Sequence, residues 1–96
     1  MRKGDTYFVR VDKKIGEKKV DKNTFDEHLE YIKKLATEIE LYAGGFAGVS
    51  GGMIVFKARN LEEADFLCKK DPIVERSYYS YELQQWELLI TSDQAL

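Results

Sequence analysis

The order of secondary-structure patterns along the chain restricts the fold more than any single residue does. Four segments have the pattern of strands and two have that of helices, in the order β-α-β-β-α-β. Because crossover connections are right-handed, this order predicts a ferredoxin-like α+β fold, with a four-stranded antiparallel sheet and both helices on one face. The first and third strands are then central. A chain of 96 residues suits one domain, and we expect residues 1–96 to form it.

The strands are recognised by β-branched and aromatic residues between polar turns. The predicted strands are Thr6–Val11, Ile39–Phe46, Met53–Ala58 and Tyr78–Ile90. In the last strand the apolar parity changes between Leu83 and Trp86, and a shift of one residue moves side chains to the other face. We therefore expect a β-bulge near Gln84-Gln85. The polar tail, residues 91–96, is expected to be frayed.

Two helices are predicted over Thr24–Glu38 and Leu61–Lys69. Thr24 and Glu27 fit a capping box at the start of the first helix, and Asn60 is the expected N-cap of the second. The residues expected to face the core recur at helical spacing. They are Phe25, Leu29, Ile32, Leu35, Ala36 and Ile39 in the first helix and Leu61, Ala64, Leu67 and Cys68 in the second. Pro72 ends the second helix and can open a further turn capped by Asp71.

Composition disfavours several classes of function. A net charge of −2 and an isoelectric point near 5.4 argue against a nucleic-acid partner. No apolar run approaches the about 20 residues of a membrane span, and the N-terminus lacks the apolar core of a signal peptide, so we expect a cytoplasmic protein with no membrane partner. A single cysteine provides no internal disulfide, and with a single histidine it makes no convincing metal site.

The two central strands carry apolar residues on both faces. One face packs on the helices, and the other presents Met53 and Val55, or their neighbours of opposite parity, to solvent. A contiguous exposed apolar face marks an interaction surface. We therefore expect a homodimer formed through the sheet face, and the alternative is a monomer that tolerates an apolar surface.

His28 and Asp71 are the residues that most suggest chemistry. An imidazole transfers protons readily near neutral pH, and a carboxylate beside it would orient it and stabilise its charged form. Each residue also has a plain structural explanation. His28 fits the edge of a core, Asp71 fits a helix cap, and their spacing alone does not bring them together. Cys68 lies in an apolar helix stripe and is expected to be core.

Glycines surround the predicted turn between the second and third strands. Gly44 and Gly45 precede Phe46, and Gly51 and Gly52 follow. Glycine allows a backbone or a ligand to approach closely, but these glycines match neither common phosphate-binding motif. A tight turn is their simpler explanation.

Several short segments together resemble the YCII-related (YciI-like) family. They are His28-Leu29, Leu41–Phe46, Gly51–Ile54, Leu61–Ala64, and Asp71-Pro72 followed by Tyr79. Each segment alone is weak, and the ordered set is moderately specific. The arginine that often precedes the family's histidine by about a turn is missing, because that region is Asn23–Phe25.

The resemblance implies a dimeric α+β barrel, with His28 and Asp71 as the active pair. We expect a cofactor-free enzyme that uses this pair for acid–base chemistry, such as isomerisation, elimination or dehydrochlorination, on a small cyclic or aromatic metabolite. Gly44, Gly45 and Phe46 would shape the mouth of its pocket. The alternatives are a non-catalytic dimeric module that binds a small molecule or a protein, and a cofactor-independent monooxygenase.

Overall fold

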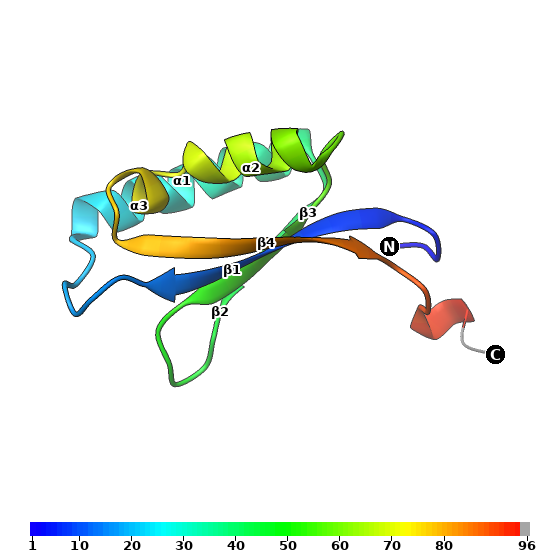
Figure 1. Cartoon of the computed structure of the whole chain (residues 1–96), viewed down its shortest axis with the longest axis horizontal. Coiled ribbons are helices and arrows are strands. Elements are labelled where there is room, and N and C mark those ends of the chain that lie inside the picture. The colour runs from blue at the N-terminus through cyan, green and yellow to red at the C-terminus, as the bar shows by residue number, and fades with distance from the viewer. Residues whose placement is uncertain (95–96) are drawn as a thin grey trace.

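The computed structural model describes residues 1–94 and has the predicted order of elements. The elements are β1 (Thr6–Lys14), α1 (Lys22–Glu38), β2 (Leu41–Gly45), β3 (Gly52–Phe56), α2 (Leu61–Lys69), the short α3 (Pro72–Glu75), β4 (Tyr79–Glu87) and a 3₁₀ turn, η1 (Ser92–Gln94). The strands form one antiparallel sheet in the order β2-β3-β1-β4. The helices lie on one side of this sheet (Figure 1). The predicted α+β fold and its central strands are therefore confirmed.

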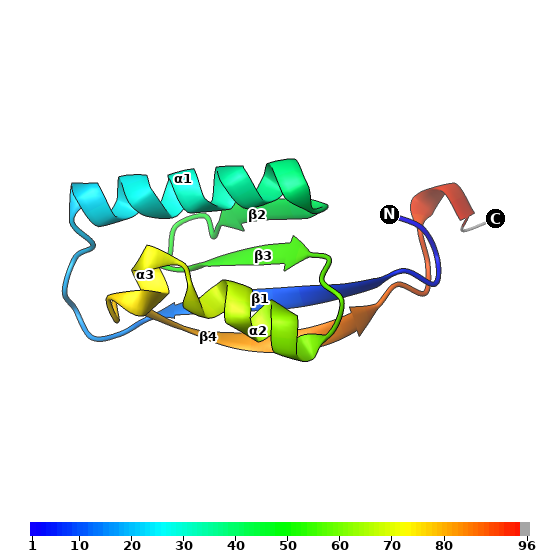
Figure 2. The same ribbon diagram turned by 90° about the horizontal axis from the view of Figure 1, so that it is seen from above.

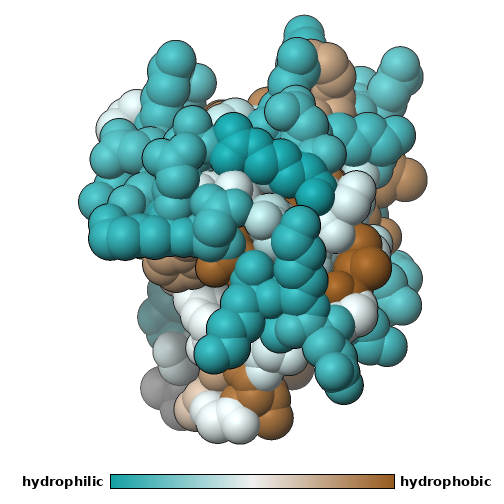
Figure 3. All heavy atoms as spheres, turned by 90° about the vertical axis from the view of Figure 1, so that its left-hand side faces the viewer, coloured by the Kyte–Doolittle hydropathy of each residue, from teal (hydrophilic) through white to brown (hydrophobic). Residues whose placement is uncertain are grey.

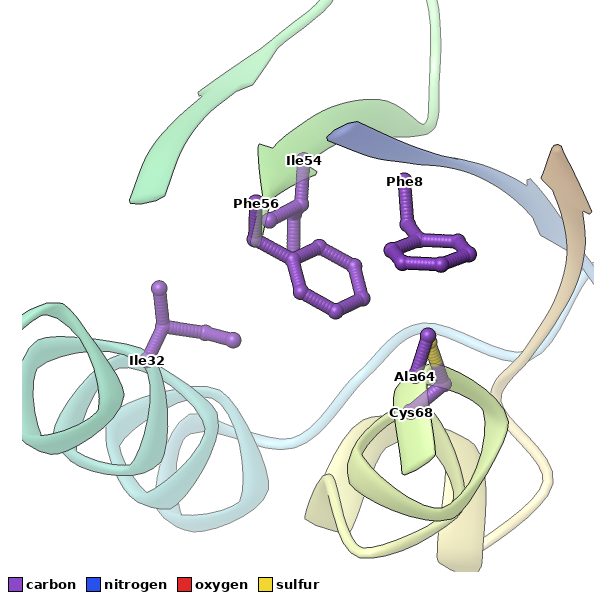
Figure 4. Close-up of a cluster of buried hydrophobic side chains, with 6 residues drawn as sticks. All are labelled: Phe8, Ile32, Ile54, Phe56, Ala64 and Cys68. Atoms are coloured by element: carbon purple, nitrogen blue, oxygen red, sulfur yellow. The ribbon is translucent and has the colours of Figure 1, made fainter. Parts of the chain in front are cut away.

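The helices divide the covered face of the sheet between them. Seen from above, α1 lies over β2, whereas α2 and α3 lie over the half formed by β1 and β4 (Figure 2). The core fills the space between the two layers, where Phe8, Ile54 and Phe56 point down from the sheet side and Ile32, Ala64 and Cys68 come from the helices (Figure 4). Burying large apolar side chains of this kind stabilises a fold by about 1.5–3 kcal/mol each.

The expected bulge near Gln84-Gln85 is wrong. The pairing of β1 with β4 runs without interruption from Thr6 opposite Glu87 to Lys14 opposite Tyr79. The parity changes because β4 uses both of its faces. Leu83 packs against the core under the helices, whereas Trp86 packs at a tilt against Tyr7 on the opposite face, with ring centroids 6.3 Å apart.

The first helix begins earlier than predicted, and its cap is Asp21. The Oδ1 atom of Asp21 accepts a hydrogen bond from the backbone N–H of Thr24 at 2.7 Å. The expected capping box of Thr24 and Glu27 is therefore wrong, and Thr24 is a buried residue of the first turn. Aspartate and threonine are both good N-caps, so residue type alone does not distinguish Asp21 from Thr24 as the cap. The predicted cap of α2 is confirmed, because Asn60 accepts from the N–H of Glu63 at 2.8 Å.

Several predicted boundaries and burials also differ. Ile39 caps the end of α1 and is not part of β2. Phe25 and Leu29 are exposed by 46% and 39%, because this part of α1 borders a cavity and does not pack fully on the sheet. Within the tail, Ser92–Gln94 form the turn η1, and residues 95–96 lie outside the described part of the chain, so the expected fraying stays a prediction. Among residues 1–94, no helix is long and apolar enough to cross a membrane.

Candidate active site

A pocket of about 220 Å³ opens between α1 and the ends of β2 and β3. Its walls are mostly apolar side chains and glycine backbone, with a few polar groups. The lining residues are Asp12, Phe25, His28, Leu29, Ile32, Ala43, Gly44, Gly45, Gly51, Gly52, Met53, Ile54, Ile73 and Tyr79. Since benzene fits a cavity of about 150 Å³, this volume suits a single substituted ring.

His28 projects from α1 into the wall of this pocket, and its side chain is only 15% exposed. Its Nδ1 atom lies 2.8 Å from both carboxylate oxygens of Asp71, which is fully buried. An ionised carboxylate only accepts hydrogen bonds, so Nδ1 carries a hydrogen that it donates to Asp71. The Nε2 atom is then the ring nitrogen left for a ligand in the pocket. The two residues that spacing alone could not pair do meet.

Asp71 holds this position because it is also a helix cap. Its Oδ1 atom accepts from the backbone N–H of Ile73 at 3.1 Å, which starts α3 at Pro72. Its Oδ2 atom accepts from Nη1 of Arg10 at 2.9 Å. Three donors therefore converge on one buried carboxylate. The structural and the chemical explanations of Asp71 apply together.

Arg10 is a site residue that the sequence analysis missed. Arg10 lies in β1 and its exposure is only 2%. Its guanidinium donates from Nε and Nη2 to the two carboxylate oxygens of Asp12, at 2.7 and 3.0 Å. Burial alone would lower the pKa of Arg10, but the hydrogen bond and charge of Asp12, with the charge of Asp71, raise it above its usual value. The sequence does contain a signal for this residue: Phe8, Arg10 and Asp12 alternate along β1 and so share its helix-facing side.

The glycines give the pocket its shape. Gly45 faces the helices, and a Cβ there would meet only the carbonyl oxygen of Gly51, at 3.9 Å. Gly51 has a φ of +100°, and a Cβ there would lie 2.5 Å from the carbonyl oxygen of Asp12, so that position requires glycine. Gly44 also lines the pocket, whereas Phe46 is not among the lining residues and is 41% exposed in the hairpin that follows.

The hairpin of residues 46–51, between β2 and β3, is the lowest part of the molecule in Figure 1 and therefore lies at the lower edge of the end view in Figure 3. That face is hydrophilic over most of its area and carries apolar residues toward its lower edge. Phe46 and Val49 are the exposed apolar side chains of this hairpin, at 41% and 68%. The structure therefore places Phe46 beside the pocket and outside its wall.

Other reactive groups lie away from the pocket. Cys68 is buried in the core, and this burial raises the pKa of its thiol to about 12. A thiol of this kind is a poor nucleophile. Within residues 1–94, no group of three or more His, Cys, Asp or Glu side chains is placed to hold a metal ion.

A model of the YCII-related domain matches residues 6–87 of the chain. The protein belongs to this family. The match covers every strand and all three α-helices, including both members of the His28–Asp71 pair. The comparison with curated protein sequences found no match.

A solved structure with a similar fold supports the architecture of this YCII-related protein. It is the 5-chloro-2-hydroxyhydroquinone dehydrochlorinase from Burkholderia phenoliruptrix AC1100, in complex with 2,5-dihydroxybenzoquinone. The two structures align with a TM-score of 0.69 over 84% of this chain and 93% of that chain, at 18% sequence identity. At this identity the similarity establishes the fold, and that protein's ligand and reaction remain its own.

Proposed function

We propose that this protein is a small cofactor-free enzyme of the cytoplasm that performs acid–base chemistry on a cyclic or aromatic metabolite. The observation that carries this proposal is the hydrogen bond between His28, in the wall of a pocket, and the buried carboxylate of Asp71. The fold shared with a dehydrochlorinase is consistent with a small-molecule enzyme. A free buried cysteine agrees with a reducing compartment.

His28 acts as the proton-transfer group in this proposal. Its Nε2 atom takes a proton from a carbon or hydroxyl of the bound ring, and Asp71 stabilises the imidazolium that forms. The electron pair left on the substrate then expels a leaving group such as chloride, which completes an elimination, or accepts the proton at another position, which completes an isomerisation. Arg10 and the N–H of Ile73 hold Asp71 in place throughout.

The test uses His28→Asn across a panel of hydroxylated and halogenated aromatics and lactones. Asparagine can still donate a hydrogen bond to Asp71 but cannot accept and return a proton. We expect ligand binding to survive and turnover to fall by at least about 100-fold, the usual contribution of general acid–base catalysis. A parent protein that turns over nothing on the panel, with binding unchanged in the variant, would instead favour a binding module.

We also propose that two copies associate through the uncovered face of the sheet. Apolar side chains from all four strands share this face, and Tyr42, Met53 and Trp86 remain 41–49% exposed there. An exposed apolar face can pair with the same face of a second copy about a two-fold axis, so a second copy is the partner that we propose. Met53 also lines the pocket, so the association would bring the partner close to the site.

The association is tested by sedimentation at several protein concentrations. We expect a dimer for the parent protein and a folded monomer for Trp86→Asp, since a charge in the middle of an apolar interface is costly. Phe66→Asp is the matched control, because Phe66 is equally apolar and 57% exposed but lies on α2, on the helical side. A monomeric parent, or equal effects of the two substitutions, would contradict this proposal.

A further inference from the structure

The pocket wall carries two polar groups that belong to one buried chain of hydrogen bonds. His28 contacts Asp71, Asp71 contacts Arg10, and Arg10 contacts Asp12. Only the two ends of this chain, His28 and Asp12, line the pocket. A ligand in the pocket therefore meets an imidazole at one place and a carboxylate at another. The guanidinium of Arg10 contacts Asp12 directly and His28 through Asp71.

Asp12 keeps the capacity to bind a ligand. Each of its oxygens accepts one hydrogen bond from Arg10, at 2.7 and 3.0 Å, and a carboxylate oxygen has room for a second. Its side chain is 10% exposed, at a position that lines the pocket. By contrast, the oxygens of Asp71 already accept hydrogen bonds from His28, Arg10 and the N–H of Ile73, and Asp71 is fully buried, so it does not contact a ligand.

The charges of the site disfavour an anionic ligand. Among residues 1–94, the pocket lining includes no lysine or arginine side chain. The one nearby guanidinium, that of Arg10, is held between Asp12 and Asp71 and does not reach the pocket wall. A carboxylate or phosphate on the ligand would therefore face Asp12 without a compensating cation, which is costly in a partly water-free site.

We propose that Asp12 is a substrate-binding residue that selects neutral rings carrying a hydroxyl group, and that Arg10 is the positioning residue that aims it. This inference rests on the proposed function for its single-ring substrate and adds the class of ring. Asp12 accepts the hydroxyl hydrogen and fixes the orientation of the ring, while Nε2 of His28 faces another position on it. Arg10 holds the two carboxylates at a set separation, because its planar fork binds both at once.

The test compares four ring compounds as probes: hydroquinone, 4-methoxyphenol, 1,4-dimethoxybenzene and 4-hydroxybenzoate. Binding is followed by NMR titration of the backbone amides of Gly45 and Gly52 in the pocket wall. We expect the parent protein to bind hydroquinone at least about tenfold more tightly than 1,4-dimethoxybenzene, since a hydrogen bond to a charged acceptor is worth this much. The anion 4-hydroxybenzoate should bind at least about tenfold more weakly than hydroquinone.

Asp12→Asn should reduce the hydroquinone preference to below about threefold and relieve the discrimination against 4-hydroxybenzoate. Arg10→Lys should lower the preference as well, because an ammonium cannot hold two carboxylates in a fork. Asp26→Asn is the control, as it removes the same charge from an exposed residue paired with Lys22. If the parent protein shows no donor preference, or binds 4-hydroxybenzoate as well as hydroquinone, the inference is wrong whether or not the variants fold.

The two proposals fail separately. Loss of turnover in His28→Asn without any donor preference in the parent would overturn the role of Asp12 and leave the enzyme proposal intact. A clear donor preference that depends on Asp12, with no turnover of any substrate, would overturn the enzyme proposal alone.

Discussion

Asp71→Ala tests how strongly the buried hydrogen-bonded chain holds the site together. The substitution removes a fully buried carboxylate that accepts hydrogen bonds from His28, Arg10 and the N–H of Ile73. Removing one partner of a buried ion pair costs about 3–5 kcal/mol. Because Arg10 keeps its two bonds to Asp12, we expect the lower end of that range, about 3 kcal/mol.

The expected loss is large for a domain of this size. Unfolding entropy is about 2.1 cal/mol/K per residue, so 96 residues give about 0.2 kcal/mol/K and a fall in Tm of about 15 °C. Asp71→Asn should lose less, about 1–2 kcal/mol, because its amide oxygen still accepts one of the bonds. The measurement is urea unfolding followed by the fluorescence of Trp86, the single tryptophan, at one protein concentration because association also stabilises.

Asp26→Ala is the matched control for this prediction. It also removes an aspartate paired with a cation, but its side chain is 53% exposed and the pair spans one turn of α1. Exposed pairs of this kind contribute about 0.3–0.5 kcal/mol. A destabilisation by Asp71→Ala no larger than that of Asp26→Ala would refute the claim that the chain of buried groups stabilises the site.

Three further predictions concern the pocket, the core and a helix cap. Gly45→Val should abolish ligand binding in NMR titrations and keep the fold, because the new side chain enters the pocket. Ser50→Val is the control, because Ser50 is exposed in the hairpin and is not a lining residue, and this variant should retain binding. Burial raises the pKa of the Cys68 thiol from 9.0 to about 12. At pH 8 this thiol should therefore react with a thiol reagent roughly 1000-fold more slowly in the native than in the urea-unfolded protein. Comparable rates in the two states would contradict this prediction. The hydrogen bond from Tyr78, with those from Thr24, lowers the pKa of Asp21 to about 2, so its stabilising effect is present above about pH 4 and is lost as the pH falls through 2. The Tm difference between the parent and Asp21→Asn should therefore be largest at pH 7 and much smaller at pH 2. A difference at pH 2 as large as that at pH 7 would contradict the assignment.

The fold could be predicted from the sequence because the hydrophobic periodicity of each segment agrees with the order of the elements. Hydrophobic periodicity placed α2 between the same two residues that the structure gives, and the order of elements determined which strands are central. The errors arose where one pattern had two physical solutions. The parity change before Trp86 was interpreted as a bulge, whereas the strand simply presents apolar residues to both faces. Asp21 and Thr24 were both competent caps, and only the packing of Thr24 decides between them.

Only part of the site could be predicted from the sequence. His28 and Asp71 could be nominated by residue type and by resemblance, but 43 positions separate them and their contact depends on how α1 packs against α3. Arg10 was missed because a charge inside a strand is interpreted by default as solvent-facing. Asp12 was missed because the first strand was predicted to end at Val11, whereas β1 continues to Lys14. Their position on the same side of β1 as Phe8 was the available signal, since a charged residue that alternates with core residues must be paired when it is buried.

The most direct test of the His28–Asp71 pair is the side-chain ¹H–¹⁵N spectrum of histidine-labelled protein. The chain has a single histidine, so every imidazole signal belongs to His28. We expect Nδ1 to carry a hydrogen in the free protein, and the Nε2 signal to shift on addition of hydroquinone while Nδ1 stays protonated. An unprotonated Nδ1, or an Nε2 signal that ignores a ligand which shifts the amides of Gly45 and Gly52, would contradict the assignment of His28 as the proton-transfer group of the pocket.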